Sequence, residues 1–246
     1  MRERLDVEMA RRGLAPSREG AQRLIMAGRV RVNSRPANKP DLRVDAATEI
    51  AVVGGGPEYA SRGAYKLSAA LDHFAIDPTG RLALDVGASN GGFTDILLIR
   101  GARRVIALDV GYGQLDYRLR GDPRVTVLDR TNVRRLAPRD LPYRPDLVVI
   151  DVSFISLRLV LPVVLEIASP AVQIVALIKP QFEVGRGMVG KGGVVRDDAA
   201  RGKAVEDLLG FARGLGLAII GPIESPIRGA AGNREFLALM SRAMTT

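Results

Sequence analysis

Apolar and polar positions along this chain follow two arrangements, one on each side of residue 60. After it, short continuous apolar runs alternate with stretches that have a helical apolar period. The clearest helix has Ser61 as a candidate N-cap, and its apolar stripe is Leu67, Ala70, Leu71 and Phe74, at i, i+3, i+4 and i+7. Continuous apolar strands separated by helices are typical of a parallel sheet covered on both faces. The pattern predicts an α/β, Rossmann-like fold.

The N-terminal pattern predicts a small α+β unit. Two short helices are expected over residues 2–12 and 17–27, the second with Ser17 as its N-cap and Gly28 just past its end. Short strands are expected over 30–32 and 48–53.

A run of three glycines and a proline at residues 54–57 interrupts any helix or strand. We therefore expect three parts: a domain over 1–53, a linker over 54–60 and a second domain over 61–246.

Five strands of the second part finish in a charge. They read LAL-Asp85, VIAL-Asp109, VTVL-Asp129, LVVI-Asp151 and IVALI-Lys179. A single charge after a strand is usually just the first loop residue. Because parallel strands end at one edge of a sheet, where open α/β folds bind their ligands, five in succession predict a polar, functional edge.

The first of these strands leads into a glycine-rich loop, residues 85–94, which reads DVGASNGGFT. Glycines let a ligand approach the backbone and the following helix N-terminus. Ser89 stands where a dinucleotide-binding motif has its second glycine, which weakens that interpretation. Asp109 can accept both hydroxyls of a ribose, and Asp129 adds an acceptor for an adenine amino group. Together these residues fit S-adenosylmethionine better than NAD.

Composition narrows the class of partner. Subtracting 27 acidic from 36 basic residues gives a net charge of +9, which suggests a polyanion such as nucleic acid. The chain has no cysteine and one histidine, His73, so thiolate chemistry and histidine metal sites are excluded, and no metal is expected. No apolar run is long enough to span a bilayer and no signal peptide is evident, so the expected location is the cytoplasm.

Most of the excess charge lies between residues 11 and 39, where a basic helix, a glycine turn and a basic strand follow one another. A merely solvated basic face is the alternative to RNA binding there. A second basic segment, the glycine-rich stretch 185–197, is expected to be a mobile loop that clamps RNA phosphate, or else a plain surface loop. The candidate RNA-binding residues are Arg11, Arg12, Arg18, Arg23, Arg29, Arg31, Arg35, Lys39, Arg186 and Lys191.

Several sequence blocks together resemble a known family. They are SREGAQRLIMAGRVRVN, SRGAYKL, DVGASNGGFTD, DVGYGQL, DRTNVR, DVSFISL, LIKPQFEVGRG, KGGVVRD and GNREF. Their order over nearly the whole chain resembles the TlyA family of ribosomal RNA 2′-O-methyltransferases. In that family an alpha-L RNA-binding domain is fused to an FtsJ-like methyltransferase domain.

The resemblance implies a cofactor, a substrate and a set of site residues. The cofactor is S-adenosylmethionine, and the partner is ribosomal RNA or a ribosomal subunit. The target is a cytidine ribose, in large-subunit 23S rRNA and in some members also in 16S rRNA; we expect the large-subunit target here. The family's catalytic tetrad falls on Lys66, Asp151, Lys179 and Glu235. Its cofactor positions fall on Asp85, Gly87, Ala88, Ser89, Gly92, Phe93, Asp109, Asp129 and Asp151.

Methyl transfer to a ribose hydroxyl requires alignment with the methyl donor and removal of the hydroxyl proton. We expect Lys179 to face the 2′-hydroxyl, either as proton acceptor or as a cation that stabilises the developing alkoxide, with Asp151 orienting it. Lys66 and Glu235 would position the ribose. Phe154 is either a core residue or a substrate contact.

Two other functions stay open at this stage. The chain could be a catalytically silent RNA-binding assembly factor, against which the intact tetrad argues. A membrane-active haemolysin, a label that relatives have carried, is disfavoured because no long amphipathic basic helix is present. The oligomeric state is left open.

Overall fold

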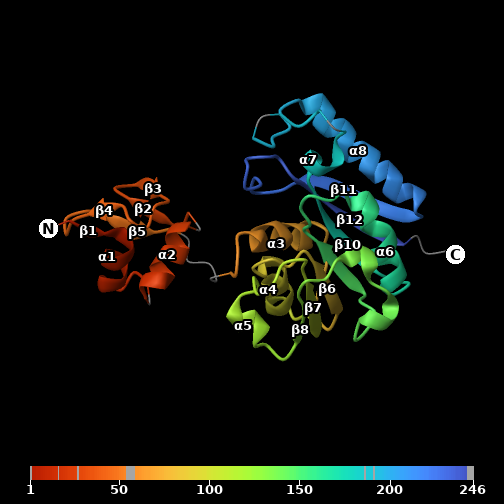
Figure 1. Cartoon of the computed structure of the whole chain (residues 1–246), viewed down its shortest axis with the longest axis horizontal. Helices are drawn as coiled ribbons and strands as arrows, with labels where there is room; N and C mark the ends of the chain where they lie inside the picture. The colour runs from red at the N-terminus through yellow and green to blue at the C-terminus, as the bar shows by residue number, and fades with distance from the viewer. Residues whose placement is uncertain are drawn as a thin grey trace. The chain divides into compact units, whose positions relative to one another are not determined.

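The computed structural model describes residues 2–15, 17–26, 28–53, 59–185, 187–190 and 192–242. It divides into two compact units, Met1–Glu58 and Tyr59–Thr246, each with its own hydrophobic core (Figure 1).

Two helices pack on two small sheets in the first unit. The helices are α1 (Leu5–Arg11) and α2 (Arg18–Met26). Strand β1 (Glu3–Arg4) pairs with β4 (Arg43–Val44), and β2 (Val30–Val32) lies between β3 (Arg35–Ala37) and β5 (Ile50–Val52), all antiparallel. Apolar residues from both helices and from β2, β4 and β5 form the core.

The predicted helices exist, although their bounds differ. Residues 3 and 4 were expected to be helical, but they pair with β4, so α1 begins at Leu5. The Ser17 cap is confirmed, since its hydroxyl accepts the backbone N–H of Gly20 at 3.0 Å. The prediction for Gly28 is also confirmed, with φ +71° just past α2. Strands β1, β3 and β4 were missed because two or three residues are too few to show alternation.

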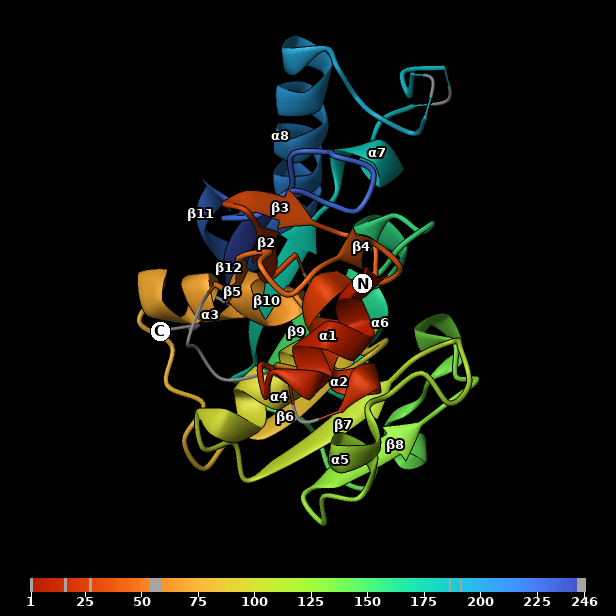
Figure 2. The same ribbon diagram turned by 90° about the vertical axis from the view of Figure 1, so that its left-hand side faces the viewer.

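A seven-stranded mixed sheet with helices on both faces makes up the second unit. Its strands are β6 (Leu82–Val86), β7 (Arg104–Leu108), β8 (Val125–Leu128), β9 (Leu147–Ile150), β10 (Gln173–Ile178), β11 (Leu217–Glu224) and β12 (Phe236–Arg242). The order across the sheet, β11-β12-β10-β9-β6-β7-β8, can be followed in Figure 2. From β10 to β8 all neighbours are parallel, and β12 and β11 are antiparallel additions.

Short and long helices connect these strands. The α-helices are α3 (Gly63–His73), α4 (Gly92–Ile99), α5 (Tyr117–Arg120), α6 (Leu161–Ile167), α7 (Pro180–Glu183) and α8 (Asp198–Gly214). Three single 3₁₀ turns are η1 (Val133–Arg135), η2 (Pro138–Asp140) and η3 (Leu157–Leu159).

Alternation along the strands explains the two-faced core. In β6, Ala83 packs into the cluster that includes α3 and α4, whereas Leu84 and Val86 pack into the cluster that includes α6 and α8. Because both faces are covered, the strands are apolar throughout, which is why they appear as continuous runs in the sequence.

The strand ends meet as the sequence predicted. Asp109, Asp129, Asp151 and Lys179 each directly follow a parallel strand, so all four lie at one carboxyl edge. Asp85 differs, because β6 continues through Val86 and Asp85 lies inside the strand, fully buried. In the part of the chain that the structure describes, no helix has the length and apolar character needed to cross a lipid bilayer.

Candidate active site

The glycine-rich loop after β6 is shaped by close backbone approach. Gly87 has φ +89°, and a Cβ there would collide with the backbone carbonyl of Asp151. Gly91 has φ +95° and leads into α4, and a side chain at Gly92 would collide with the Ser61 hydroxyl. These glycines are therefore required by the space between the loop, α3 and β9.

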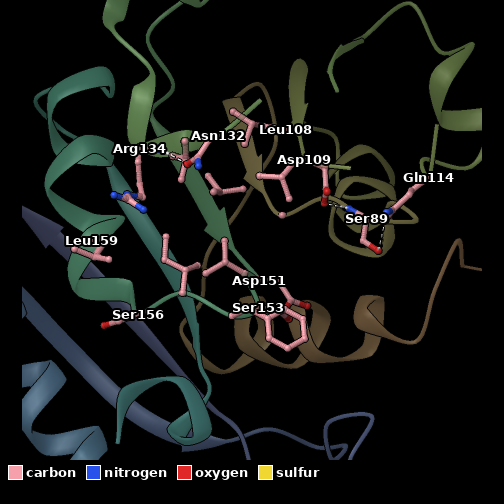
Figure 3. A pocket seen from close by; sticks show the side chains of 17 residues that line it. Ser89, Leu108, Asp109, Gln114, Asn132, Arg134, Asp151, Ser153, Ser156 and Leu159 are labelled. Atoms are coloured by element: carbon pink, nitrogen blue, oxygen red, sulfur yellow. Dashed lines mark hydrogen bonds between the residues drawn. The ribbon is translucent and has the colours of Figure 1, made fainter. Parts of the chain in front are cut away.

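Beside this loop lies a cavity of about 700 Å³ at the carboxyl edge of β6, β7 and β9. Figure 3 shows Ser89 hydrogen-bonded to Asp109 on one side of the cavity and Asn132 and Arg134 on another. Predicted residues in its lining are Gly87, Ser89, Asp109 and Asp151. The others include Gln114, Asn132, Arg134 and the loop from Val152 to Ser156.

Asp109 is held by the loops on both sides of it. Its Oδ2 accepts the backbone N–H of Ser89 at 2.8 Å, and its Oδ1 accepts that of Gly111 at 2.7 Å. Each carboxylate oxygen retains a further lone pair, so Asp109 can still accept hydroxyl donors inside the cavity.

Asp85 and Asp129 were predicted to bind the cofactor, but neither residue is part of the lining of the two cavities described here. Asp85 accepts the backbone N–H (2.9 Å) and hydroxyl (2.7 Å) of Thr94, through Oδ2, and burial raises its pKa to about 7. Its Oδ1 is buried without a hydrogen-bond partner among the described residues. Asp129 forms an ion pair with Arg120 at 2.8 Å, and this pairing lowers the pKa of the Asp129 carboxyl. Asp85 thus supports the start of α4, and Asp129 fixes α5.

A second cavity, of about 300 Å³, adjoins the first and contains three of the four predicted tetrad residues in its lining. Gly87, Ser89, Asp151 and Ser153 line both cavities. The Lys179 Nζ forms an ion pair with Asp151 Oδ1 at 2.6 Å and donates to Ser153 Oγ at 2.9 Å. Ala88, Gly92 and Phe93 line this cavity rather than the larger one.

The other two tetrad residues form a buried ion pair. Lys66, on α3, donates to Glu235 Oε2 at 2.6 Å, and the residues are 8% and 3% exposed. Glu235 directly precedes β12, and Gly229 allows the preceding loop to pass over it, since a side chain there would collide with Oε1. The predicted tetrad therefore consists of two ion pairs, one between residues 169 positions apart and one between residues 28 positions apart.

The loop after Asp151 is held by hydrogen bonds to Glu183 at one end, and it is exposed to solvent at Phe154. Glu183 on α7 accepts the Ser156 hydroxyl at 2.6 Å and the backbone N–H of Leu157 at 2.8 Å, and burial raises its pKa. Phe154, by contrast, is 92% exposed with φ +64°, and its ring lies 5.2 Å from that of Phe182. The core-packing interpretation of Phe154 is wrong.

Comparison with known proteins identifies this arrangement. A family model described as FtsJ-like methyltransferase matches residues 59–242, and one described as S4 domain matches residues 3–50. The chain belongs to the TlyA family of FtsJ-like methyltransferases. It is therefore a methyltransferase that uses S-adenosylmethionine.

Relatives cover between 79% and 99% of the chain. The 16S/23S rRNA (cytidine-2′-O)-methyltransferase TlyA of Mycobacterium tuberculosis is 52% identical over 96% of this chain and 88% of its own. The 23S rRNA (cytidine-2′-O)-methyltransferase TlyA of Campylobacter jejuni is 36% identical over 79% of this chain and 72% of its own. A solved structure named as a hemolysin, from Streptococcus thermophilus, has a TM-score of 0.78 at 41% identity, covering 99% of this chain and 90% of that one.

The S4 unit uses some of its predicted RNA-binding cations internally. Arg11 and Arg12 both pair with Glu8 at 2.6 Å, and Arg12 also donates to the carbonyls of Thr48 and Asp45. Arg18 pairs with the buried Asp6 at 3.1 Å. Glu8 and Asp6 lie just before the basic segment counted from the sequence, so the count overstated its free charge.

The remaining predicted cations are placed differently. Arg23, Arg31, Arg35 and Lys39 are exposed, and Arg29 is half-buried beside them in sequence. Arg186 and Lys191 lie outside the described residues.

The sequence reasoning missed several residues of the two cavities. Ser153 lies within the DVSF block, between the assigned Asp151 and Phe154, and Arg62 lies within SRGAYKL, four residues before the assigned Lys66. Both blocks had already been matched to the family, so their other polar residues could have been predicted to line the site. Arg228 and Ala230 come from a loop whose place in the fold no local pattern indicates.

Proposed function

We propose that this protein methylates the ribose 2′-oxygen of a cytidine in ribosomal RNA, with the large-subunit 23S rRNA as its target. The single observation that carries the proposal is the Lys179–Asp151 ion pair, in which Asp151 lines both cavities and Lys179 lines the smaller one. The named activities of the two TlyA relatives support the nucleotide, and the S4 unit supports an RNA substrate.

The larger cavity fits the cofactor on the evidence of its own residues. Gly87 lines the cavity with backbone atoms alone, and Asp109 retains acceptor capacity on a carboxylate that the loop holds in place. Gly87, Ser89 and Asp109 would hold S-adenosylmethionine, while Gln114 and Asn132 extend the polar lining. When bound, that cofactor supplies an electrophilic methyl group on a sulfonium.

The smaller cavity would hold the ribose. Lys179, held by Asp151, faces the hydroxyl and either accepts its proton or stabilises the alkoxide as it develops. The buried Lys66–Glu235 pair fixes the side of the cavity formed by α3 and the loop before β12. Phe154, whose ring packs against the half-buried Phe182, offers an exposed aromatic face in the lining of the larger cavity, where a base can stack.

Methylation mapping tests the proposal. Purified subunits lacking the modification would be incubated with protein and labelled S-adenosylmethionine, and the ribose methylation sites in 23S and 16S rRNA would be mapped. We expect one cytidine in 23S rRNA to gain a methyl group. Label in 16S rRNA as well would correct the target, and the absence of any label with either subunit would contradict the function.

A further inference from the structure

Charges in the smaller cavity do not cancel. The two tetrad lysines are balanced by their carboxylate partners, at 2.6 Å in each pair. Two further cations line the same cavity, Arg62 at the N-cap of α3 and Arg228 in the loop before β12. Neither of these forms an ion pair with a residue of the described ranges, and the Nη1 of Arg228 reaches only the carbonyl of Gly232, at 3.4 Å.

Two guanidinium groups that form no ion pair within the described ranges indicate an anionic ligand. Both arginines are exposed, and they come from opposite ends of the methyltransferase unit, so only the fold brings them to one cavity. A guanidinium presents its N–H groups in a planar fork that matches two oxygens of a phosphate group. At about 300 Å³, the cavity is at the small end of ligand sites and suits one nucleotide unit rather than a duplex.

We propose that Arg62 and Arg228 form a phosphodiester-binding site that holds the RNA backbone next to the ribose facing Lys179. The inference rests on the proposed function. It adds a reason why the enzyme would act on a nucleotide that is part of an RNA strand rather than on a free nucleoside. A free nucleoside would leave both guanidinium groups without a ligand and would not be held in place.

The test compares Arg62→Ala, Arg228→Ala and the double variant with Arg103→Ala. Arg103 is an exposed arginine just before β7, at the opposite edge of the sheet, and serves as the control. The measurements are kcat/KM for methylation of unmodified subunits at several salt concentrations, and S-adenosylmethionine affinity by calorimetry.

Each cavity variant should lose roughly 5- to 20-fold in kcat/KM, as expected for a charged hydrogen bond to a partly exposed phosphate. The slope of log kcat/KM against log salt should fall by about 0.7 to 0.9 for each lost phosphate contact. Cofactor affinity should not change, and Arg103→Ala should match wild type.

A double variant with wild-type kcat/KM and salt slope would overturn the inference while leaving the proposed function intact. A parallel loss of cofactor affinity would also overturn it, because the arginines would then serve the larger cavity. If the wild-type protein methylates no RNA, both this inference and the proposed function fail.

A second inference rests on the hydrogen bond from Lys179 to Ser153. The amine nitrogen of a lysine side chain has three directions besides its bond to carbon. In Lys179 two of them are occupied, one by Asp151 Oδ1 and one by Ser153 Oγ. The third direction stays open for the substrate oxygen, whether it carries a proton or a lone pair.

We infer that Ser153 is a positioning residue, which together with Asp151 fixes the rotation of the Lys179 amine towards the hydroxyl to be methylated. Its place on the wall shared by both cavities agrees with this role. The inference rests on the proposed function, but not on the arginines.

Substitution of Ser153 separates positioning from packing. Ser153→Ala should lower kcat about 10- to 100-fold, because misplacement of a reacting group by about 1 Å has effects of this size. The KM for subunits and the cofactor affinity should stay within about twofold, and Ser153→Thr, which keeps the hydroxyl, should recover most of kcat. Ser68→Ala on α3, whose hydroxyl bonds Arg100 away from both cavities, is the control.

Two results would overturn this second inference. One is an unchanged kcat in Ser153→Ala, with active wild type measured alongside. The other is an equal loss in Ser153→Thr and Ser153→Ala, which would assign the effect to the shape of the loop.

Discussion

The two units of this protein use their cations in opposite ways. In the S4 unit, Arg11, Arg12 and Arg18 pair with acids that lie within twelve residues of them in the sequence. In the methyltransferase unit, Lys66 and Lys179 pair with acids 169 and 28 residues away, at the edge of a sheet. In the S4 unit, arginines therefore form ion pairs with acids close to them in the sequence, and these pairs stabilise the unit. In the methyltransferase unit, the parallel sheet brings charged residues that are distant in sequence to one edge.

The largest contrast is expected in activity. Lys179→Ala should abolish methylation, a loss of at least about 1,000-fold, because it removes the group proposed to face the hydroxyl. Replacement of one exposed S4 cation, such as Arg23→Ala, should lower activity by no more than about tenfold, since each is one of several proposed RNA contacts. Single-turnover methyl transfer at saturating subunit concentration separates the two cases, with cofactor binding as the check on folding. Wild-type transfer by Lys179→Ala would contradict the assignment.

Stability should show the next largest difference. Glu235→Ala leaves the Lys66 ammonium buried without its partner, so the free energy of unfolding should fall by about 3 to 5 kcal/mol. Arg11→Ala breaks an ion pair whose arginine side chain is 64% exposed, and it should change the free energy of unfolding by less than about 1 kcal/mol. Denaturant titration of the full chain measures both. The double variant Lys66→Met/Glu235→Leu should recover stability but not methylation.

The two units should also respond oppositely to pH. Burial raises the pKa of Asp85 to about 7, so the folded state keeps a proton that the unfolded chain releases above about pH 4. The stabilisation from this carboxyl is complete below pH 4 and is lost as the pH rises to about 7. Asp85→Asn should therefore raise the melting temperature by several degrees at pH 8 and by little at pH 4. An equal shift at both pH values would contradict the role of ionisation.

In the S4 unit the sign is reversed. Hydrogen bonds from Arg4 lower the pKa of Asp6, so its stabilisation is present above pH 4 and is lost as the pH falls further. Asp6→Asn should lower the melting temperature of this unit at pH 7 and have less effect at pH 3, as followed by circular dichroism.

The smallest expected effects distinguish S4 arginines that stabilise the unit from those proposed to bind RNA. Arg12→Ala should destabilise the unit by about 1 to 2 kcal/mol, because its guanidinium joins Glu8 to the carbonyls of Thr48 and Asp45. Arg35→Ala should leave stability within about 0.5 kcal/mol and weaken binding to ribosomal RNA, with a smaller salt dependence. Filter binding and thermal melts distinguish the two. If both arginines affect only RNA binding, the internal role of Arg12 is wrong.

Topology made the active edge predictable from sequence. Continuous apolar runs between helices imply parallel strands, and parallel strands place Asp109, Asp151 and Lys179 together without any knowledge of side-chain contacts. Glu235 could be assigned only through the family resemblance, because the antiparallel strand β12 follows it and breaks the pattern.

Other residues could not be placed from the sequence. Asp85 looks like the other strand ends, yet β6 continues one residue further, and this single step turns its carboxylate into the core. Arg12 and Arg35 were both predicted to bind RNA, and the contacts of Arg12 with Glu8 and with residues 45–48 set it apart.

Gly87 carries one more consequence. Since no side chain fits between it and the carbonyl of Asp151, the loop proposed to hold the methyl donor lies directly against the start of the loop proposed to face the acceptor. A larger residue at position 87 would push these two loops apart, and with them the two sites between which the methyl group would pass.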